Sequence, residues 1–88
     1  MDPYEWDESK YATNLKKHQI AFELIYEFDW SNAAFDVDDR FDYGEERLLA
    51  FGRIDGRGYA VVYVKRGDRV RIISMRRAHD KELAVYDL

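Results

Sequence analysis

The stretch from residue 44 to residue 77 constrains the fold of this chain more than any other part of the sequence. It reads as three β-strands, over 46–53, 59–66 and 69–76, separated by short segments that contain glycine and aspartate. Asp55-Gly56 and Gly67-Asp68 are residue pairs that tolerate the backbone angles of tight turns. Because short turns join neighbouring strands in antiparallel fashion, the sequence predicts an antiparallel sheet in chain order.

Helix signals lie before these strands. Asp7 is suited to cap a helix over 8–18, since its carboxylate can accept the first unpaired amide hydrogens. Trp6 and Tyr11 flank this cap with the spacing of a hydrophobic staple. A second helix is predicted over 21–28, where apolar residues recur on one face.

The remaining segments complete the predicted fold. A last helix is expected over 77–86, and residues 1–6 form an extended lead-in that could pair as a short edge strand. Residues 29–43 are acidic and dotted with aromatics, so a solvated loop, an irregular edge strand and a docking surface all stay open. The sequence therefore predicts an α+β fold, with N-terminal helices packed on a small antiparallel sheet and a C-terminal helix, as one domain over 1–88.

Composition narrows the classes of function. The net charge is −4, but residues 1–45 carry four basic and twelve acidic side chains, whereas residues 46–88 carry ten and six. A basic strand region on an acidic body can bind RNA, an acidic partner or its own acidic half. No cysteine and only two histidines are present, so we expect no metal and no cofactor. No secretory signal or membrane-length apolar run appears, which predicts a cytoplasmic protein that contacts no membrane.

Side-chain alternation sorts the predicted hairpin into two faces if Arg66 pairs with Arg69 across the turn. One face, expected to pack under the helices, carries Ala60, Val62, Val64, Ile73 and Met75. The other, expected to be open, carries Tyr59, Val61, Tyr63, Lys65, Val70, Ile72, Ser74 and Arg76. Tyrosines on an open face would stack on RNA bases and cations would neutralise phosphates. The alternative is that these are ordinary strand residues and solvated charges, and a register slip of one residue would exchange the faces.

An ordered set of short segments resembles a known family. The segments are Tyr4-Glu5-Trp6-Asp7, Lys10, Asn14, Lys17-His18, Phe22-Glu23, Glu45-Glu46-Arg47, Gly52, Val61-Val62-Tyr63, Arg66-Gly67 and Arg71-Ile72-Ile73-Ser74-Met75-Arg76-Arg77-Ala78. In this order and spacing they resemble the BrnT family, toxins of type II toxin–antitoxin systems. The resemblance covers nearly the whole chain.

The resemblance implies a RelE-like fold and a metal-independent endoribonuclease that cleaves RNA and halts translation. It also implies a BrnA-like antitoxin with a ribbon-helix-helix domain as partner, with DNA contacted only through that antitoxin. Many members carry a His-Ser pair where this chain has Phe41-Asp42. That departure favours an alternative, in which the chain is a weakly active or inactive binding module that acts as co-repressor partner of the antitoxin.

Cleaving RNA without metal requires a base for the 2′-hydroxyl, an acid for the leaving oxygen and cations for the phosphate. His18 is the natural titrating group, although it could instead serve only to close its helix. Glu45 or Glu46 is a further candidate for the general base. The full set of catalytic candidates is His18, Glu46, Arg76 and Arg77. Candidates for substrate binding are Lys10, Asn14, Lys17, Tyr59, Tyr63, Lys65, Arg66 and Ser74. The alternatives are structural ion pairs for Glu46, Arg76 and Arg77, and a solvated or antitoxin-contacting stripe for Lys10, Asn14 and Lys17.

Overall fold

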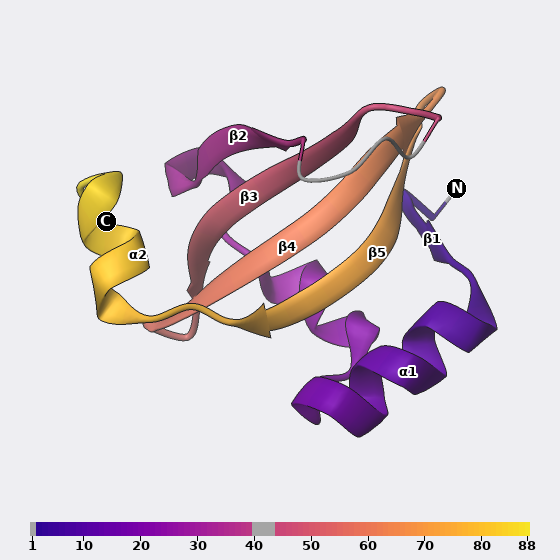
Figure 1. Cartoon of the computed structure of the whole chain (residues 1–88), viewed down its shortest axis with the longest axis horizontal. Coiled ribbons are helices and arrows are strands. Elements are labelled where there is room, and N and C mark those ends of the chain that lie inside the picture. Colours follow the sequence, from indigo (N-terminus) through magenta and orange to yellow (C-terminus); the bar gives the residue numbers. More distant parts are fainter. Residues whose placement is uncertain (1, 40–43) are drawn as a thin grey trace.

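A curved five-stranded sheet forms the centre of the computed structural model, which describes residues 2–39 and 44–88 (Figure 1). The strands are β1 (Tyr4–Trp6), β2 (Ala34–Asp38), β3 (Arg47–Ile54), β4 (Arg57–Arg66) and β5 (Arg69–Arg77). They lie in the order β1-β5-β4-β3-β2, with β1 parallel to β5 and every other pair antiparallel. The predicted α+β class and the antiparallel pairing of the three central strands are confirmed. Phe41 and Asp42, where the sequence departs from the family pattern, lie outside the described residues.

Helix α1 (Glu8–His18) has the predicted bounds. The Asp7 carboxylate accepts a hydrogen bond from the Ser9 amide at 2.8 Å, and the Trp6 and Tyr11 rings meet edge to face at 5.7 Å. The helix ends at Gln19, which adopts a left-handed backbone with φ of 60° and donates its amide to the Leu15 carbonyl. In the described part of the chain, no helix is long and apolar enough to cross a membrane.

The second predicted helix is a 3-10 helix, η1 (Phe22–Glu27), and not an α-helix over 21–28. Ala21 has no side chain that can cap the first turn, and i, i+3 neighbours eclipse in 3-10 geometry. That geometry places Phe22 and Ile25 on one line, and both are fully buried. Burial of these two side chains therefore decides the geometry of this segment more than a regular α-helical hydrogen-bond pattern does.

The acidic segment and the C-terminus differ from the predictions in extent. A short 3-10 helix, η2 (Trp30–Asn32), leads into β2, so the edge-strand alternative holds for this part of the segment. Helix α2 (Asp80–Val85) is shorter than the predicted helix over 77–86. The reason is that β5 continues through Arg77, after which the Ala78 amide donates to the Gly58 carbonyl at 3.0 Å.

The predicted assignment of the two hairpin faces is wrong. Tyr59, Val61, Tyr63 and Ile72 belong to the main hydrophobic core with Phe22 of η1, so the face that carries them lies under the N-terminal helices. The opposite face carries Ala60 and Phe51, which pack beneath Leu83 of α2. Because α2 is short, it covers only one end of this second face (Figure 1).

A β-bulge explains why part of the prediction nevertheless holds. Arg66 pairs with Arg69 as predicted, but the register shifts between Tyr63↔Ile72 and Val62↔Ser74. Ile73 is thus an extra residue in β5, which reverses the alternation beyond it. Met75 consequently falls on the core face, whereas Ser74 and Arg76 fall on the open face.

Candidate functional site

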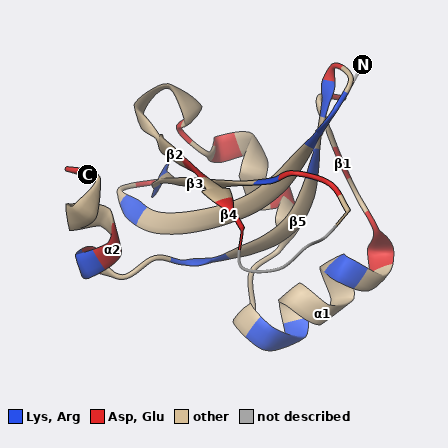
Figure 2. Cartoon of the chain, turned by 45° about the horizontal axis from the view of Figure 1, so that its top comes forward, with Lys and Arg blue, Asp and Glu red and all other residues tan. Residues whose placement is uncertain are grey.

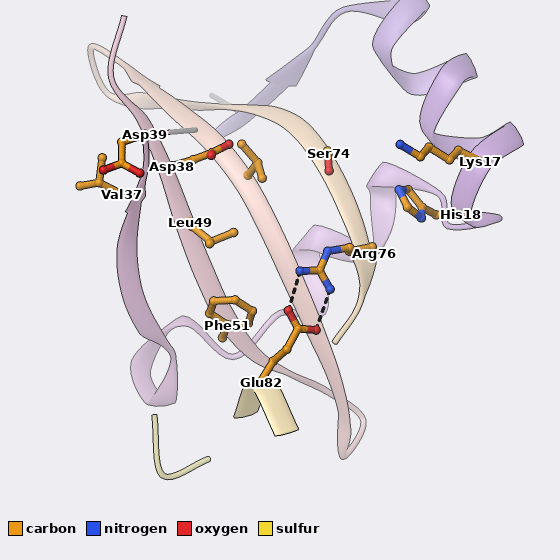
Figure 3. Close-up of a pocket in the computed structure, with 11 residues that line it drawn as sticks. Lys17, His18, Val37, Asp38, Asp39, Leu49, Phe51, Ser74, Arg76 and Glu82 are labelled. Atoms are coloured by element: carbon orange, nitrogen blue, oxygen red, sulfur yellow. Dashed lines mark hydrogen bonds and ion pairs between the residues drawn. The ribbon is translucent and has the colours of Figure 1, made fainter. Parts of the chain in front are cut away.

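A pocket of about 380 Å³ lies on the open face of the sheet, between the end of α1 and α2 (Figure 3). We call it the sheet pocket. Four of the predicted site residues, Lys17, His18, Ser74 and Arg76, lie on one side of it. Its lining comprises Lys17, His18, Val37, Asp38, Asp39, Leu49, Phe51, Val62, Ser74, Arg76 and Glu82.

A smaller pocket of about 190 Å³ continues along α1. It shares Lys17, His18 and Ser74 with the sheet pocket, so the two hollows adjoin. Its other lining residues are Lys10, Thr13, Asn14 and Ile73. Figure 2 shows basic residues on α1 and β5 and acidic residues where β2 ends. A polyanion could therefore pass along α1 and reach the sheet pocket from its basic side.

Arg76 is held in position by Glu82 of α2. Its two terminal nitrogens donate to the two carboxylate oxygens of Glu82 at 2.8 and 2.7 Å, and the same carboxylate accepts the His79 amide at 2.9 Å. The hydrogen bonds from Arg76 and from the His79 amide hold the pKa of Glu82 at about 2, below its usual 4.5. The guanidinium therefore has a fixed orientation at the pocket wall while its side chain stays about one-third exposed, at 34%. This is the ion pair considered as an alternative role, but it also presents Arg76 to the pocket.

His18 lies half-buried at the end of α1, on the same wall. Desolvation lowers the pKa of its imidazole below 6.5, and the positive charges of Lys17 and Arg76 lower that pKa further. At neutral pH the imidazole is therefore mostly unprotonated. An unprotonated imidazole can accept a proton, which is the property required of a general base.

Asn14 has a structural role that the sequence analysis missed. Its side chain is buried, and its amide nitrogen donates to the carbonyls of Met75 and Ile20 at 2.9 and 3.2 Å, while its oxygen accepts the Met75 amide at 3.0 Å. Strand β1 pairs with β5 only as far as Ile72, so Asn14 satisfies the β5 backbone where β1 no longer does. Asn14 therefore fixes α1, and with it His18, against β5. Asn14 also lines the smaller pocket along α1, so the substrate contact predicted for it stays a prediction.

Tyr59 and Tyr63 are 7% and 4% exposed and form part of the core. The prediction that they lie on an open face is wrong, because the helix-covered face is the one that carries them. Arg77 is on the same side of the sheet. Its Nε donates to the Gly58 carbonyl at 3.2 Å and its guanidinium carbon lies 5.3 Å from the centre of the Tyr59 ring, so Arg77 does not line the sheet pocket.

Three more candidates lie away from the sheet pocket. Glu46 is exposed just before β3 and is absent from the pocket lining. Lys65 borders an aromatic hollow with Trp30 and other residues on the opposite side of the sheet. Arg66 forms an ion pair with Glu45 at 3.2 Å near the β4–β5 turn. The structure therefore brings together the candidates on α1 and the end of β5, and separates them from these three.

Sequence reasoning missed the acidic side of the sheet pocket. Asp38 is the last residue of β2 and Asp39 follows it, and Figure 3 places both across the pocket from Arg76, with Leu49 and Phe51 between. The sequence signal was only a run of aspartates, and no local pattern sets the pairing of β2 with β3. Among residues 2–39 and 44–88, no group of three or more histidine and carboxylate side chains is placed to hold a metal ion.

Comparison with known proteins identifies the family of this chain. No curated protein gives a significant match to the sequence. A family model described as the ribonuclease toxin BrnT of type II toxin–antitoxin systems matches residues 6–82, which include the last residue of β1, all of α1, strands β2 to β5 and the first half of α2. The chain therefore belongs to the BrnT family of ribonuclease toxins.

Proposed function

We propose that this chain, acting as a single RelE-like domain over 1–88, is a metal-independent endoribonuclease whose active site is the sheet pocket. The observation that carries the proposal is the convergence of His18, from α1, and Arg76, from the end of β5, on one pocket wall. A base with a lowered pKa beside a fixed phosphate-pairing guanidinium is the pair of functions that RNA transesterification needs. Membership in a ribonuclease family makes RNA the substrate that this pair would serve.

The proposed reaction follows from the positions of these side chains. Neutral His18 accepts the proton of a ribose 2′-hydroxyl, and the 2′-oxygen attacks the adjacent phosphorus. Arg76 and Lys17 neutralise the charge that accumulates on the phosphate oxygens in the transition state. The bond from phosphorus to the 5′-oxygen then breaks, and a proton relayed from the imidazolium through water completes the 5′-hydroxyl. The products are a 2′,3′-cyclic phosphate and a 5′-hydroxyl end.

Matched variants test this assignment. His18→Ala and Arg76→Ala should each relieve growth arrest when the chain is induced without an antitoxin, because each removes one of the two functions. Lys16→Ala and Arg57→Ala are the controls, since they remove exposed side chains from α1 and from β4 outside the sheet pocket. Circular dichroism should show that all four variants stay folded. Full toxicity of both test variants would place the active site elsewhere.

The wider role we propose is that of a toxin that acts in the cytoplasm and inhibits translation. A ribbon-helix-helix antitoxin would neutralise it and would supply the only contact with DNA. Covering the basic wall of the sheet pocket would be the direct way to silence the enzyme. Co-expression with the adjacent gene, followed by size-exclusion chromatography, tests this partner, and separate elution of the two proteins would count against it.

One observation favours a second candidate function. Three carboxylates, from Asp38, Asp39 and Glu82, outnumber the two cations, Lys17 and Arg76, in the sheet pocket. That balance opposes binding of a phosphate backbone along the whole pocket and suits a chain that acts mainly as a co-repressor partner of its antitoxin. A wild-type protein that leaves RNA intact and growth unaffected, yet co-elutes with the antitoxin, would support this second function.

A further inference from the structure

We infer that the sheet pocket holds one nucleotide and selects guanine, with the 3′-phosphate of that nucleotide on the basic wall and its base against the acidic wall. The inference rests on the proposed ribonuclease function and names the substrate of the same site. It starts from the separation of charge across the pocket. Lys17, His18 and Arg76 lie on one side and Asp38 and Asp39 on the other (Figure 3).

The distance across the pocket exceeds what a bare phosphate would fill. The acidic wall belongs to β2 and the basic wall to β5, with β3 and β4 between them. Neighbouring strands lie about 4.8 Å apart, which places β2 about 14 Å from β5 before side chains are considered. The long Arg76 side chain closes part of that interval, and a nucleotide can span the rest.

The floor between the walls is apolar. Leu49, Phe51 and Val62 line it, and Phe51 is 5% and Val62 8% exposed. The Phe51 ring is supported by the ring of Tyr86, the residue that follows α2, at 5.0 Å with an interplanar angle of 24°. A rigid apolar floor binds the flat face of a base, as in other pockets that hold an unstacked base against apolar side chains.

The acidic wall decides which base fits. Glu82 is not the reading group, because its carboxylate already accepts three hydrogen bonds, two from Arg76 and one from the His79 amide, which leaves about one of its four lone-pair sites and none for a paired contact. Asp38 and Asp39 remain, and Asp38 is 6% exposed at the pocket wall. An ionised carboxylate offers about four lone-pair sites, so one that is already engaged within the chain can accept further hydrogen bonds.

Guanine is the base that matches an acceptor-only wall. Its Watson–Crick edge presents two neighbouring donors, N1–H and N2–H, to which one carboxylate can bond in parallel. Adenine and cytosine each present one amino donor next to a ring nitrogen that repels a carboxylate. Uracil presents a single N3–H between two carbonyl oxygens. A good bidentate contact is worth about tenfold or more in discrimination between bases.

Binding of nucleoside 3′-monophosphates tests the inference without requiring catalysis. Isothermal titration of the wild-type protein with the guanosine, adenosine, cytidine and uridine 3′-monophosphates should give the tightest Kd for guanosine, about tenfold below that for uridine. Asp38→Asn and Asp39→Asn should together remove most of this preference, while phosphate binding persists. Asp55→Asn is the matched control, because Asp55 is an exposed aspartate in the turn between β3 and β4, outside the pocket lining.

The outcomes separate this inference from the proposed function. Equal affinity for the four nucleotides, tighter binding of uridine, or a guanosine preference unchanged by both aspartate substitutions would overturn it. Asp39→Asn alone decides the matter if the buried Asp38 variant fails to fold. Selective guanosine binding by a protein that cleaves no RNA would support the inference and refute the ribonuclease proposal. Cleavage mapped to sites that do not follow guanine would support the ribonuclease proposal and refute the selection of guanine.

Discussion

Replacing Asn14 with alanine should destabilise the protein strongly, because Asn14 is the buried residue of α1 and is polar. Asn14 is 4% exposed and makes three hydrogen bonds, to the Met75 amide, the Met75 carbonyl and the Ile20 carbonyl, at 3.0, 2.9 and 3.2 Å. Alanine keeps the helix but removes all three bonds. The Met75 backbone, whose residue is fully buried, would then lack the partners that Asn14 supplies.

The magnitude follows from these contacts. A typical intramolecular hydrogen bond contributes about 1 kcal/mol net, and a buried amide left without a partner costs about 1–3 kcal/mol more. With three bonds lost, we therefore expect the free energy of unfolding to fall by about 4–6 kcal/mol, a large part of the 5–15 kcal/mol typical of a domain. For a chain of this size, 1 kcal/mol shifts Tm by roughly 4–8 °C, so the lower figure alone corresponds to about 16–32 °C.

Thermal unfolding followed by far-UV circular dichroism measures this effect directly. Thr13→Ala is the matched control, since Thr13 is the exposed neighbour on the same helix and its replacement should change the free energy of unfolding by less than about 0.5 kcal/mol. A Tm for Asn14→Ala within about 2 °C of the wild type would refute the reasoning. It would mean that Asn14 is not what joins α1 to β5.

Three further predictions concern stability and pH. The pKa of Glu82 is about 2 in the folded protein and ordinarily 4.5, so the ion pair of Glu82 stabilises the fold fully above pH 4.5, and this stabilisation is lost as the pH falls towards 2. Because the Glu82 side chain is 29% exposed, we expect a contribution of about 1–2 kcal/mol. The difference in the pH dependence of urea unfolding between wild type and Glu82→Gln measures it. The pKa of His18 is lowered, so the acidic limb of the pH profile of kcat/KM should lie below pH 6.5. Lys17→Ala should move this limb to higher pH, because the charge of Lys17 is one cause of the lowered pKa. A limb that stays in place would show that His18 is not the group whose titration controls the rate. Gly58→Ala should cost about 1–3 kcal/mol in chemical denaturation, since a Cβ there would meet Leu83 Cδ1 at 2.5 Å, and an unchanged midpoint would show that Leu83 repacks freely.

Local signals in the sequence were sufficient to predict the features that depend on a few neighbouring residues. The Asp7 cap and the Trp6–Tyr11 contact set the start of α1, and each joins residues that are no more than five positions apart in the sequence. The Gly67-Asp68 turn fixed the pairing of Arg66 with Arg69 in the same way. Such interactions are readable because the residues that make them are neighbours in the chain.

The sheet faces could not be predicted from alternation alone. The bulge at Ile73 reverses the alternation of β5 beyond it, and no residue type in Ile72-Ile73-Ser74 marks the place. The choice of face depends on where Phe22 and Ile25 pack, which is a tertiary contact. Aromatic strand residues fit a buried face as well as an open one, so the tyrosine pattern did not decide between them.

The sheet pocket, too, was predictable from the sequence only in part. Lys17, His18, Ser74 and Arg76 were singled out from the sequence, and the structure places them on one wall. Their roles in catalysis and binding remain proposals that the variants above test. The opposite wall was not predictable, because Asp38 reaches the pocket through the pairing of β2 with β3, whose register no short sequence pattern specifies.

The rate at which purified protein cleaves a defined single-stranded RNA tests the central claim most directly. It should be measured for the wild type, His18→Ala and Arg76→Ala, each with and without EDTA. We predict that EDTA leaves the wild-type rate unchanged and that each substitution lowers it by about 10²–10³-fold, as expected for loss of a general base or of a charge-stabilising donor. The 5′ fragment should end in a 2′,3′-cyclic phosphate. A rate abolished by EDTA, or variants as fast as the wild type, would contradict the account.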